Sequence, residues 1–188
     1  SSSLFDERSE AIENRFNIQL DGLEYDAKFV FAIPGYNLEG NEMGAAFGLV
    51  QLESLENNIK VERAKKNITQ CEFFNKYSEY FSNPIEAEKI STAFLAFPVL
   101  IKDTAPFTRK QFQIYLENRE IQTRVCFTGN ILRQPMTRGI TKVVRDEGYP
   151  NADAIMERGV LLPVHHGMTD EMFDRLHNTI DEFIAEHI

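Results

Sequence analysis

The chain has 188 residues, of which 43% are hydrophobic and 26% charged, and its formal net charge is −9. This composition predicts a packed globular domain rather than a disordered segment, and no apolar run approaches the roughly 20 residues that span a bilayer. The negative charge argues against general nucleic-acid binding, because it repels phosphate backbones, but it leaves room for a local basic pocket.

Residues 1–33 do not form a clear unit of their own. The pattern predicts a short helix over residues 9–16 and an apolar, β-prone segment over residues 25–33. Neither segment has an obvious partner in its own neighbourhood. We therefore interpret residues 1–33 as the remnant of a larger domain, which ends at the turn residues 34–37.

A long helix is predicted from residue 42 to residue 80, and the turn and helix together define a unit over residues 34–82. Apolar residues recur along it at spacings of three and four, which is typical of a buried stripe formed by Leu49, Leu52, Leu55 and Ile59. Small residues in its first turns would let another backbone approach closely. Asn83 and Pro84 are expected to end the helix.

Residues 83–188 predict a small domain in which strands and helices alternate, so the fold class is α/β. Strands are expected over residues 92–101, 121–127 and 160–164, and Pro98 favours an edge position for the first. Thr108 and Gln111 fit a capping box at the start of a helix. Thr169 is a good N-cap for the last helix, whose buried face continues to Ile184.

The segment 35–51 reads GYNLEGNEMGAAFGLVQ and resembles the Gly-Tyr-Asn turn and following helix of the DegT/DnrJ/EryC1/StrS family. Later motifs also match, at Arg63, Gly129-Asn130, Gln134-Pro135, Asn151-Ala152-Asp153 and Leu162-Pro163. The resemblance covers about residues 15–188. It implies the C-terminal part of a fold type I enzyme, like aspartate aminotransferase, with a small antiparallel or mixed sheet covered by helices.

Within that family the chain looks most similar to the hexulose 3-dehydratases of lipopolysaccharide sugar synthesis. The resemblance implies pyridoxal or pyridoxamine 5′-phosphate as cofactor and a nucleotide-linked 4-keto-6-deoxyhexose as substrate, for 3-dehydration or transamination by a homodimer. The lysine or histidine that reacts with the cofactor lies upstream in such enzymes. We therefore assign no catalytic residue here and expect the fragment to be inactive alone.

Asn37 is the best candidate for a cofactor ligand. The resemblance implies that Asn37 reaches across the homodimer and donates to the cofactor phosphate of the neighbouring subunit. A side-chain amide has the donors for this role, and a turn before a helix directs backbone donors the same way. The alternative is that Asn37 only tolerates the turn or caps the helix.

Two further groups are candidates for substrate binding. Arg124, Asn130 and Arg133 would form one cluster, because an arginine fork suits a nucleotide diphosphate, although surface pairing with an acid explains arginines equally well. His165 and His166 are the second group, and the resemblance implies that one lines the sugar pocket. The alternative is structural hydrogen bonding. Adjacent histidines on a strand would point to opposite faces and so would not share a metal.

The two cysteines, Cys71 and Cys126, make neither a zinc set nor a disulfide framework, so we expect free thiols, no metal site and a cytoplasmic protein without a signal peptide. Some related dehydratases hold an iron–sulfur cluster near this chain's start. Residues 1–16 contain no cysteine, so no cluster is expected. The alternative to an enzyme fragment is a non-catalytic module that binds a protein partner or a nucleotide sugar.

Overall fold

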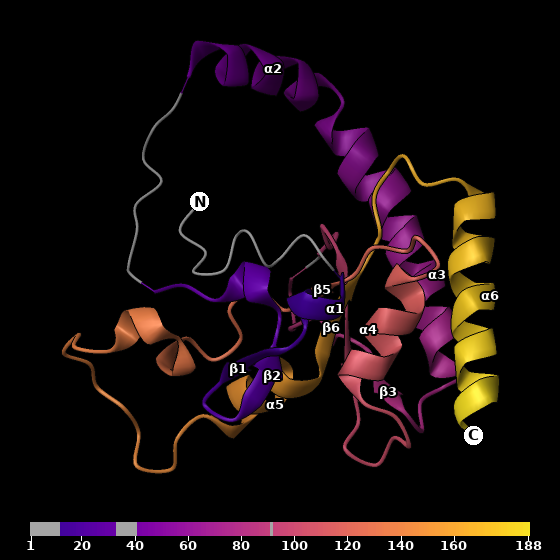
Figure 1. Ribbon diagram of the computed structural model, residues 1–188. Coiled ribbons are helices and arrows are strands. Elements are labelled where there is room, and N and C mark those ends of the chain that lie inside the picture. Colours follow the sequence, from indigo (N-terminus) through magenta and orange to yellow (C-terminus); the bar gives the residue numbers. More distant parts are fainter. Residues whose placement is uncertain (1–11, 33–40, 91) are drawn as a thin grey trace.

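The computed structural model describes residues 12–32, 41–90 and 92–188 (Figure 1). It confirms the α/β fold. The α-helices in this part of the chain are α1 (Ile12–Arg15), α2 (Glu42–Glu53), α3 (Ala64–Asn75), α4 (Arg109–Glu117), α5 (Pro150–Arg158) and α6 (Asp170–His187). The strands are β1 (Ile18–Leu20), β2 (Leu23–Tyr25), β3 (Phe81–Ser82), β4 (Phe97–Ile101), β5 (Arg124–Val125) and β6 (Gly159–Leu162).

The first two strands form a hairpin that the sequence analysis missed. β1 pairs antiparallel with β2, and the turn residues Asp21 and Gly22 have φ of +51° and +80°. An Asp-Gly pair between apolar residues is a strong hairpin signal, because both positions of this turn need positive φ. Of the β-prone segment over residues 25–33, only the start lies in a strand: β2 ends at Tyr25, and Asp26 caps a short 3₁₀ helix, η2 (Ala27–Phe29).

The hairpin is anchored to the rest of the chain through a small core of its own. Tyr25, Val30 and Leu20 are buried there against Val125 and Met156, which come from β5 and α5. Residues more than a hundred positions apart therefore share one cluster. The start of the described chain is held in place by the segment that carries the predicted substrate ligands.

The four-stranded sheet has the order β3-β4-β6-β5, and neighbouring strands are antiparallel. The predicted edge position of Pro98 is wrong, because β4 lies between β3 and β6. The pairing with β3 involves only Leu100 and Ile101, so Pro98 lies beyond the end of β3. Its missing N–H therefore removes no hydrogen bond to that strand.

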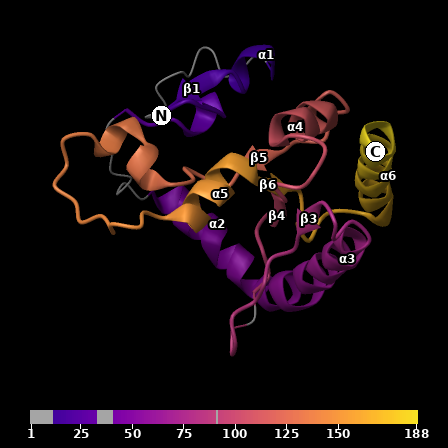
Figure 2. The ribbon, with the colours of Figure 1, turned by 90° about the horizontal axis from the view of Figure 1, so that it is seen from below.

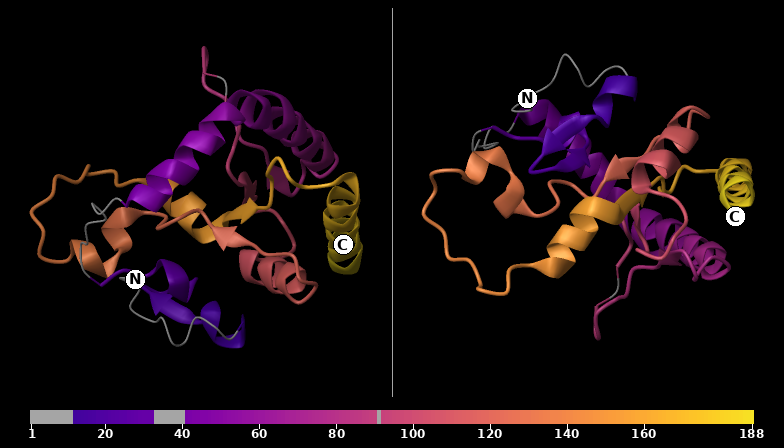
Figure 3. Two further views of the ribbon diagram at one scale, coloured as in Figure 1. Left: turned by 90° about the horizontal axis from the view of Figure 1, so that it is seen from above. Right: turned by 60° about the horizontal axis from the view of Figure 1, so that its bottom comes forward.

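The main core lies between this sheet and three helices. α3, α4 and α6 lie on one side of the sheet, whereas α5 lies on the other (Figure 2). Both predicted caps are confirmed. Thr108 and Gln111 form the capping box of α4, and the Thr169 side chain accepts a hydrogen bond from Met172 N at the start of α6. Helix α6 lies at the periphery of the molecule in both views of Figure 3.

The predicted long helix is interrupted and shorter than expected. α2 is followed by a π-helical segment, η3 (Asn57–Arg63), and α3 ends at Asn75 rather than at residue 80. Successive turns, each closed by a hydrogen bond between residues three positions apart, then lead to Phe81, which pairs with Ile101 in the sheet. The tertiary pairing of β3 therefore overrides the helical pattern of residues 76–80.

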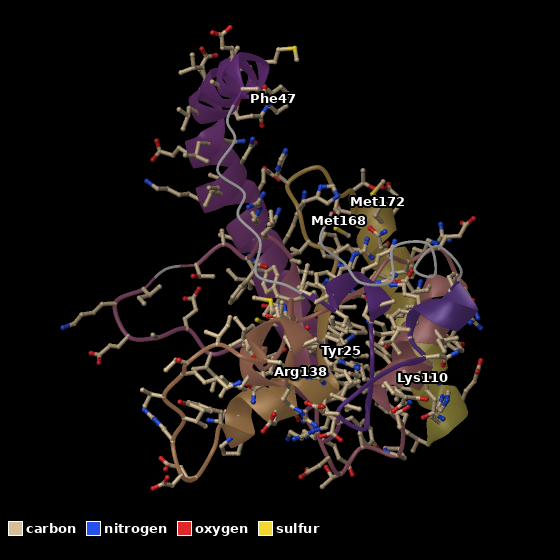
Figure 4. All side chains as sticks on the ribbon, turned by 60° about the vertical axis from the view of Figure 1, so that its left-hand side comes forward. Tyr25, Phe47, Lys110, Arg138, Met168 and Met172 are labelled. Carbon is tan, nitrogen blue, oxygen red and sulfur yellow. The ribbon has the colours of Figure 1, made fainter. Side chains whose placement is uncertain are left out.

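The apolar stripe on α2 has no partner within the described residues. Leu49 is 67% exposed, Leu52 62% and Phe47 68%, and no described residue of α2 is buried. Phe47 lies on α2, outside the body of the molecule, whereas Tyr25 lies within it (Figure 4). A helix that is mostly apolar, with its large side chains more than half exposed, is typical of a surface that another protein surface covers.

The two histidines of α6, His177 and His187, are half-buried, and each ring stacks on a phenylalanine. The His177 ring stacks on Phe73 with centroids 3.9 Å apart, and its Nε2 lies 3.0 Å from Gln70 Oε1. The His187 ring stacks on Phe183. Burial, reinforced by the charge of Lys76, lowers the pKa of His177 to about 4.

This lowered pKa predicts an acid-sensitive fold. Because folding favours the neutral imidazole of His177, its contribution to stability is complete above the unfolded pKa of about 6.5 and is lost as pH falls towards 4. We expect the melting temperature of the His177→Phe variant to fall less between pH 7 and pH 4.5 than that of the unsubstituted chain. Circular dichroism melts at both pH values test this, and equal falls would contradict it.

Candidate functional site

Asn37, the predicted cofactor ligand, lies in residues 33–40, outside the described residues. Its role stays a prediction. The helix that follows begins as the turn chemistry requires, because the Asn41 side chain accepts a hydrogen bond of 2.7 Å from Gly44 N.

The predicted cluster of Arg124, Asn130 and Arg133 is divided between two sets of partners. Asn130 Nδ2 and Arg133 Nη1 both donate to Asp153 Oδ1, at 2.9 and 3.4 Å. Arg124 instead donates to the carbonyl oxygen of Thr123 at 2.7 Å. Two of the three side chains are thus brought together around one carboxylate, and their role towards a substrate stays a prediction.

A strained turn at Phe127, between Arg124 and Asn130, was not predicted from the sequence. Phe127 has φ of +51°, a conformation that non-glycine residues rarely adopt, yet its side chain is 67% exposed. The buried Tyr25 donates from its hydroxyl to the Phe127 carbonyl at 3.0 Å, and Gly129 follows with φ of +62°. Because strain persists only where surrounding contacts impose it, the hairpin fixes this turn beside Asn130.

His165 and His166 do not lie on a strand, so the expected alternation between faces does not apply. β6 ends at Leu162, and both histidines belong to the connection before α6. Their ring centroids are 6.2 Å apart. Within the described residues, no group of three or more His, Cys, Asp or Glu side chains could hold a metal ion.

The histidines meet basic residues of the long helical segment. Lys66 Nζ donates to the carbonyl oxygen of His166 at 2.6 Å, although 100 residues separate them. Partial burial, followed by the positive charges of His166, Lys66 and Arg63, lowers the pKa of His165. We call Arg63, Lys66, His165 and His166 the basic cluster. The sequence analysis identified its histidines, but nothing in local spacing could have indicated Lys66.

The two thiols are free, as expected. Cys71 lies on α3, and Cys126 follows β5. Burial raises the pKa of Cys126 to about 11, so its thiolate is scarce at neutral pH and neither nucleophilic nor metal-binding chemistry is favoured there. Among the described helices, none is long and apolar enough to span a membrane.

Comparison with known proteins extends these observations. Residues 5–181 match the model of the DegT/DnrJ/EryC1/StrS aminotransferase family. The chain is 31% identical over 178 residues to the lipopolysaccharide biosynthesis protein RfbH of Salmonella typhimurium, covering 91% of this chain and 39% of RfbH. It is 29% identical over 180 residues to dTDP-4-dehydro-2,6-dideoxy-D-glucose 3-dehydratase of Saccharopolyspora spinosa, covering 92% of this chain and 37% of that protein.

A solved structure shows the same fold. The crystal structure of GDP-4-keto-6-deoxymannose-3-dehydratase with a trapped PLP–glutamate geminal diamine superimposes with a TM-score of 0.63 and 24% identity, covering 87% of this chain and 46% of that chain. This chain spans about two fifths of the length of the curated relatives it matches. The match nevertheless includes nearly all of its own residues, and the chain therefore belongs to the DegT/DnrJ/EryC1/StrS aminotransferase family.

Proposed function

We propose that this chain is the C-terminal part of an enzyme that uses pyridoxal or pyridoxamine 5′-phosphate and acts on a nucleotide-linked 4-keto-6-deoxyhexose. The observation that carries the proposal is the extent of the match: nine tenths of the chain align with relatives named for nucleotide-sugar or lipopolysaccharide biosynthesis. The reaction is either removal of the 3-hydroxyl or transfer of an amino group, and the upstream catalytic residue decides between them.

The residues of this chain suit ligand binding rather than the chemical step of the proposed reaction. The basic cluster fits an anionic group, since it places two cationic side chains and two imidazoles at the junction of α3 with the β6–α6 connection. The cofactor, when bound, supplies an electron sink for the sugar carbons. Lys66 is already hydrogen-bonded to a carbonyl, and nothing about it suggests a covalent role.

The chain divides into three units with different roles in the proposed enzyme. Residues 1–33 belong to the cofactor-binding domain, residues 34–82 join it to the small domain, and residues 83–188 form that small domain. The exposed apolar surface of α2 supports a contact with the cofactor-binding domain within a homodimer. Asn37 would then donate to the cofactor phosphate of the other subunit.

A turnover assay tests the proposal. The complete gene product and the 188-residue chain are each incubated with the cofactor, glutamate and a nucleotide-linked 4-keto-6-deoxyhexose. We expect only the complete product to convert the sugar, and mass spectrometry will show whether it loses its 3-hydroxyl or gains an amino group. Mixed with pyridoxal phosphate, the chain alone should show no lysine adduct that survives dialysis. A stable adduct there, or an unchanged sugar in both reactions, would refute the proposal.

A further inference from the structure

One buried glutamine is hydrogen-bonded to two segments that lie far apart in the sequence. Gln134 is 1% exposed. Its Nε2 donates to the carbonyl oxygens of Phe29 and Thr128, each at 3.0 Å, and its Oε1 accepts from Phe31 N at 3.2 Å. Two carbonyls and one N–H match the two donors and the acceptor of a side-chain amide. The motif that Gln134 forms with Pro135 has no role in the proposed function.

The hydrogen bond from Gln134 to Thr128 closes a loop over residues 127–134, which we call the 127–134 loop. Asn130 lies inside this loop, is 7% exposed and donates to Asp153 Oδ1 at 2.9 Å. Its own Oδ1 accepts from Leu132 N at 3.1 Å. Because the Asn130 side chain is bonded to the backbone of its own loop, the path of that backbone decides where its amide lies.

The hairpin holds the same loop near both ends. At one end, the Tyr25 hydroxyl donates to the Phe127 carbonyl at 3.0 Å. At the other end, Arg133 Nη2 donates to the Asp21 carbonyl at 3.2 Å. These bonds and those of Gln134 all join the loop to residues 21–31. Because Phe127 has a strained φ of +51°, its turn depends on such contacts from outside the loop.

The other side of the loop is open. Phe127 is 67% exposed and Ile131 50%, and the Arg133 side chain is 31% exposed. The loop is therefore anchored on the side of the hairpin and accessible on the opposite side, as a loop that presents ligand-binding groups must be. Gln134 belongs to the anchored side, since it is buried and its amide is bonded to backbone at both its nitrogen and its oxygen.

We propose that Gln134 is a positioning residue, which fixes the 127–134 loop so that Asn130 and Arg133 can meet the nucleotide part of the substrate. The inference rests on the proposed function, which supplies the nucleotide-linked sugar. Gln134 acts through the loop and not on the ligand, because its side chain is buried. Its bonds to Phe29 and Phe31 align the loop with the unit of residues 1–33, which belongs to the proposed cofactor-binding domain.

Isothermal titration calorimetry on the complete gene product, with GDP and dTDP as separate probes, tests the positioning role. Gln134→Met keeps an unbranched side chain but removes its hydrogen bonds, and it should weaken nucleotide binding about tenfold. Tyr25→Phe removes the hydroxyl alone and should weaken binding about threefold. Gln113→Met is the matched control. Gln113 is also fully buried, but its Nε2 donates to Thr123 Oγ1, outside the loop, so binding should stay unchanged.

A double-mutant cycle separates positioning from general destabilisation. In a chain that already carries Asn130→Ala and Arg133→Gln, Gln134→Met should weaken nucleotide binding by less than about twofold more, because the groups that Gln134 positions are gone. A purely structural role predicts the same loss with and without those two substitutions. If Gln134→Met does not fold, Tyr25→Phe replaces it in the cycle, since that variant keeps the buried ring.

The possible results are distinct. A loss of binding that disappears in the cycle supports the inference. Unchanged binding in Gln134→Met, an equal loss in both backgrounds, or a complete product that binds neither nucleotide overturns it. Sugar turnover separates the inference from the proposed function. A product that binds nucleotide through the loop but converts no sugar contradicts the function alone, whereas a product that converts limiting sugar equally well with Gln134→Met contradicts the inference alone.

Discussion

Replacing Asp26 with alanine is expected to lower the free energy of unfolding by roughly 3 kcal/mol, because a buried guanidinium loses its principal partner and keeps only Glu117 and a backbone carbonyl. Arg15 is 4% exposed and Asp26 is fully buried, and they form a two-pronged ion pair with distances of 3.0 and 2.6 Å. Arg15 also reaches Glu117 at 3.3 Å and the Thr123 carbonyl at 3.1 Å. The pair therefore ties the hairpin to α4 and β5.

Urea unfolding of the two proteins measures this loss, and an exposed ion pair on the same hairpin provides the control. Glu24 pairs with Lys110 at 3.0 Å, but both side chains are more than a third exposed. Glu24→Gln should therefore cost less than about 1 kcal/mol. If Asp26→Ala costs no more than this control, the buried pair does not hold the hairpin. A double variant, Arg15→Met with Asp26→Leu, should recover part of that stability, because the buried guanidinium is gone and Glu117 keeps its hydrogen bonds from Thr123 N and Oγ1.

Substituting Gly129 with alanine is expected to cost about 2–4 kcal/mol, through an overpacked contact and an unfavourable backbone conformation. A Cβ atom there would lie 2.5 Å from Met156 Cβ and 2.9 Å from Tyr25 Oη, and Gly129 has φ of +62°. Met156 and Tyr25 are fully buried, so neither can move aside freely. The turn that presents Phe127 would shift as a result.

Gly139 separates the two causes. Its φ is +82°, but an added Cβ would meet nothing within 4 Å. Gly139→Ala should therefore cost only about 1 kcal/mol, from backbone conformation alone. The difference between the two variants in urea unfolding measures the steric part. Equal losses at both glycines would show that close packing at Gly129 is not required.

The predicted site residues show where sequence reasoning stops. The resemblance singled out the motif at Asn130 and one of His165 and His166, and the chemistry of the arginine fork added Arg133. It could not show that Asn130 and Arg133 share Asp153, because the partner lies 20 or more residues away. Nor could it show that Lys66 meets His166 across 100 residues. Hydrogen bonds between distant segments depend on how the helices and strands pack, and the local sequence pattern does not specify this packing.

Single-sequence patterns succeeded where local physics decides the outcome. The capping box of α4 and the N-cap of α6 involve residues three positions apart, so the sequence by itself determined them. The Asp-Gly turn at Asp21 is equally local, so its hairpin was predictable, although the sequence analysis assigned no structure to residues 17–24.

Tertiary structure decided the features that depend on distant contacts. The helix pattern ran on to residue 80, but pairing of Phe81 with Ile101 ended α3 at Asn75. His177 is polar and lies on a surface helix, yet its ring stacks on Phe73 and is half-buried. In both cases the free energy gained from nonlocal packing exceeds the small local preference that the sequence expresses.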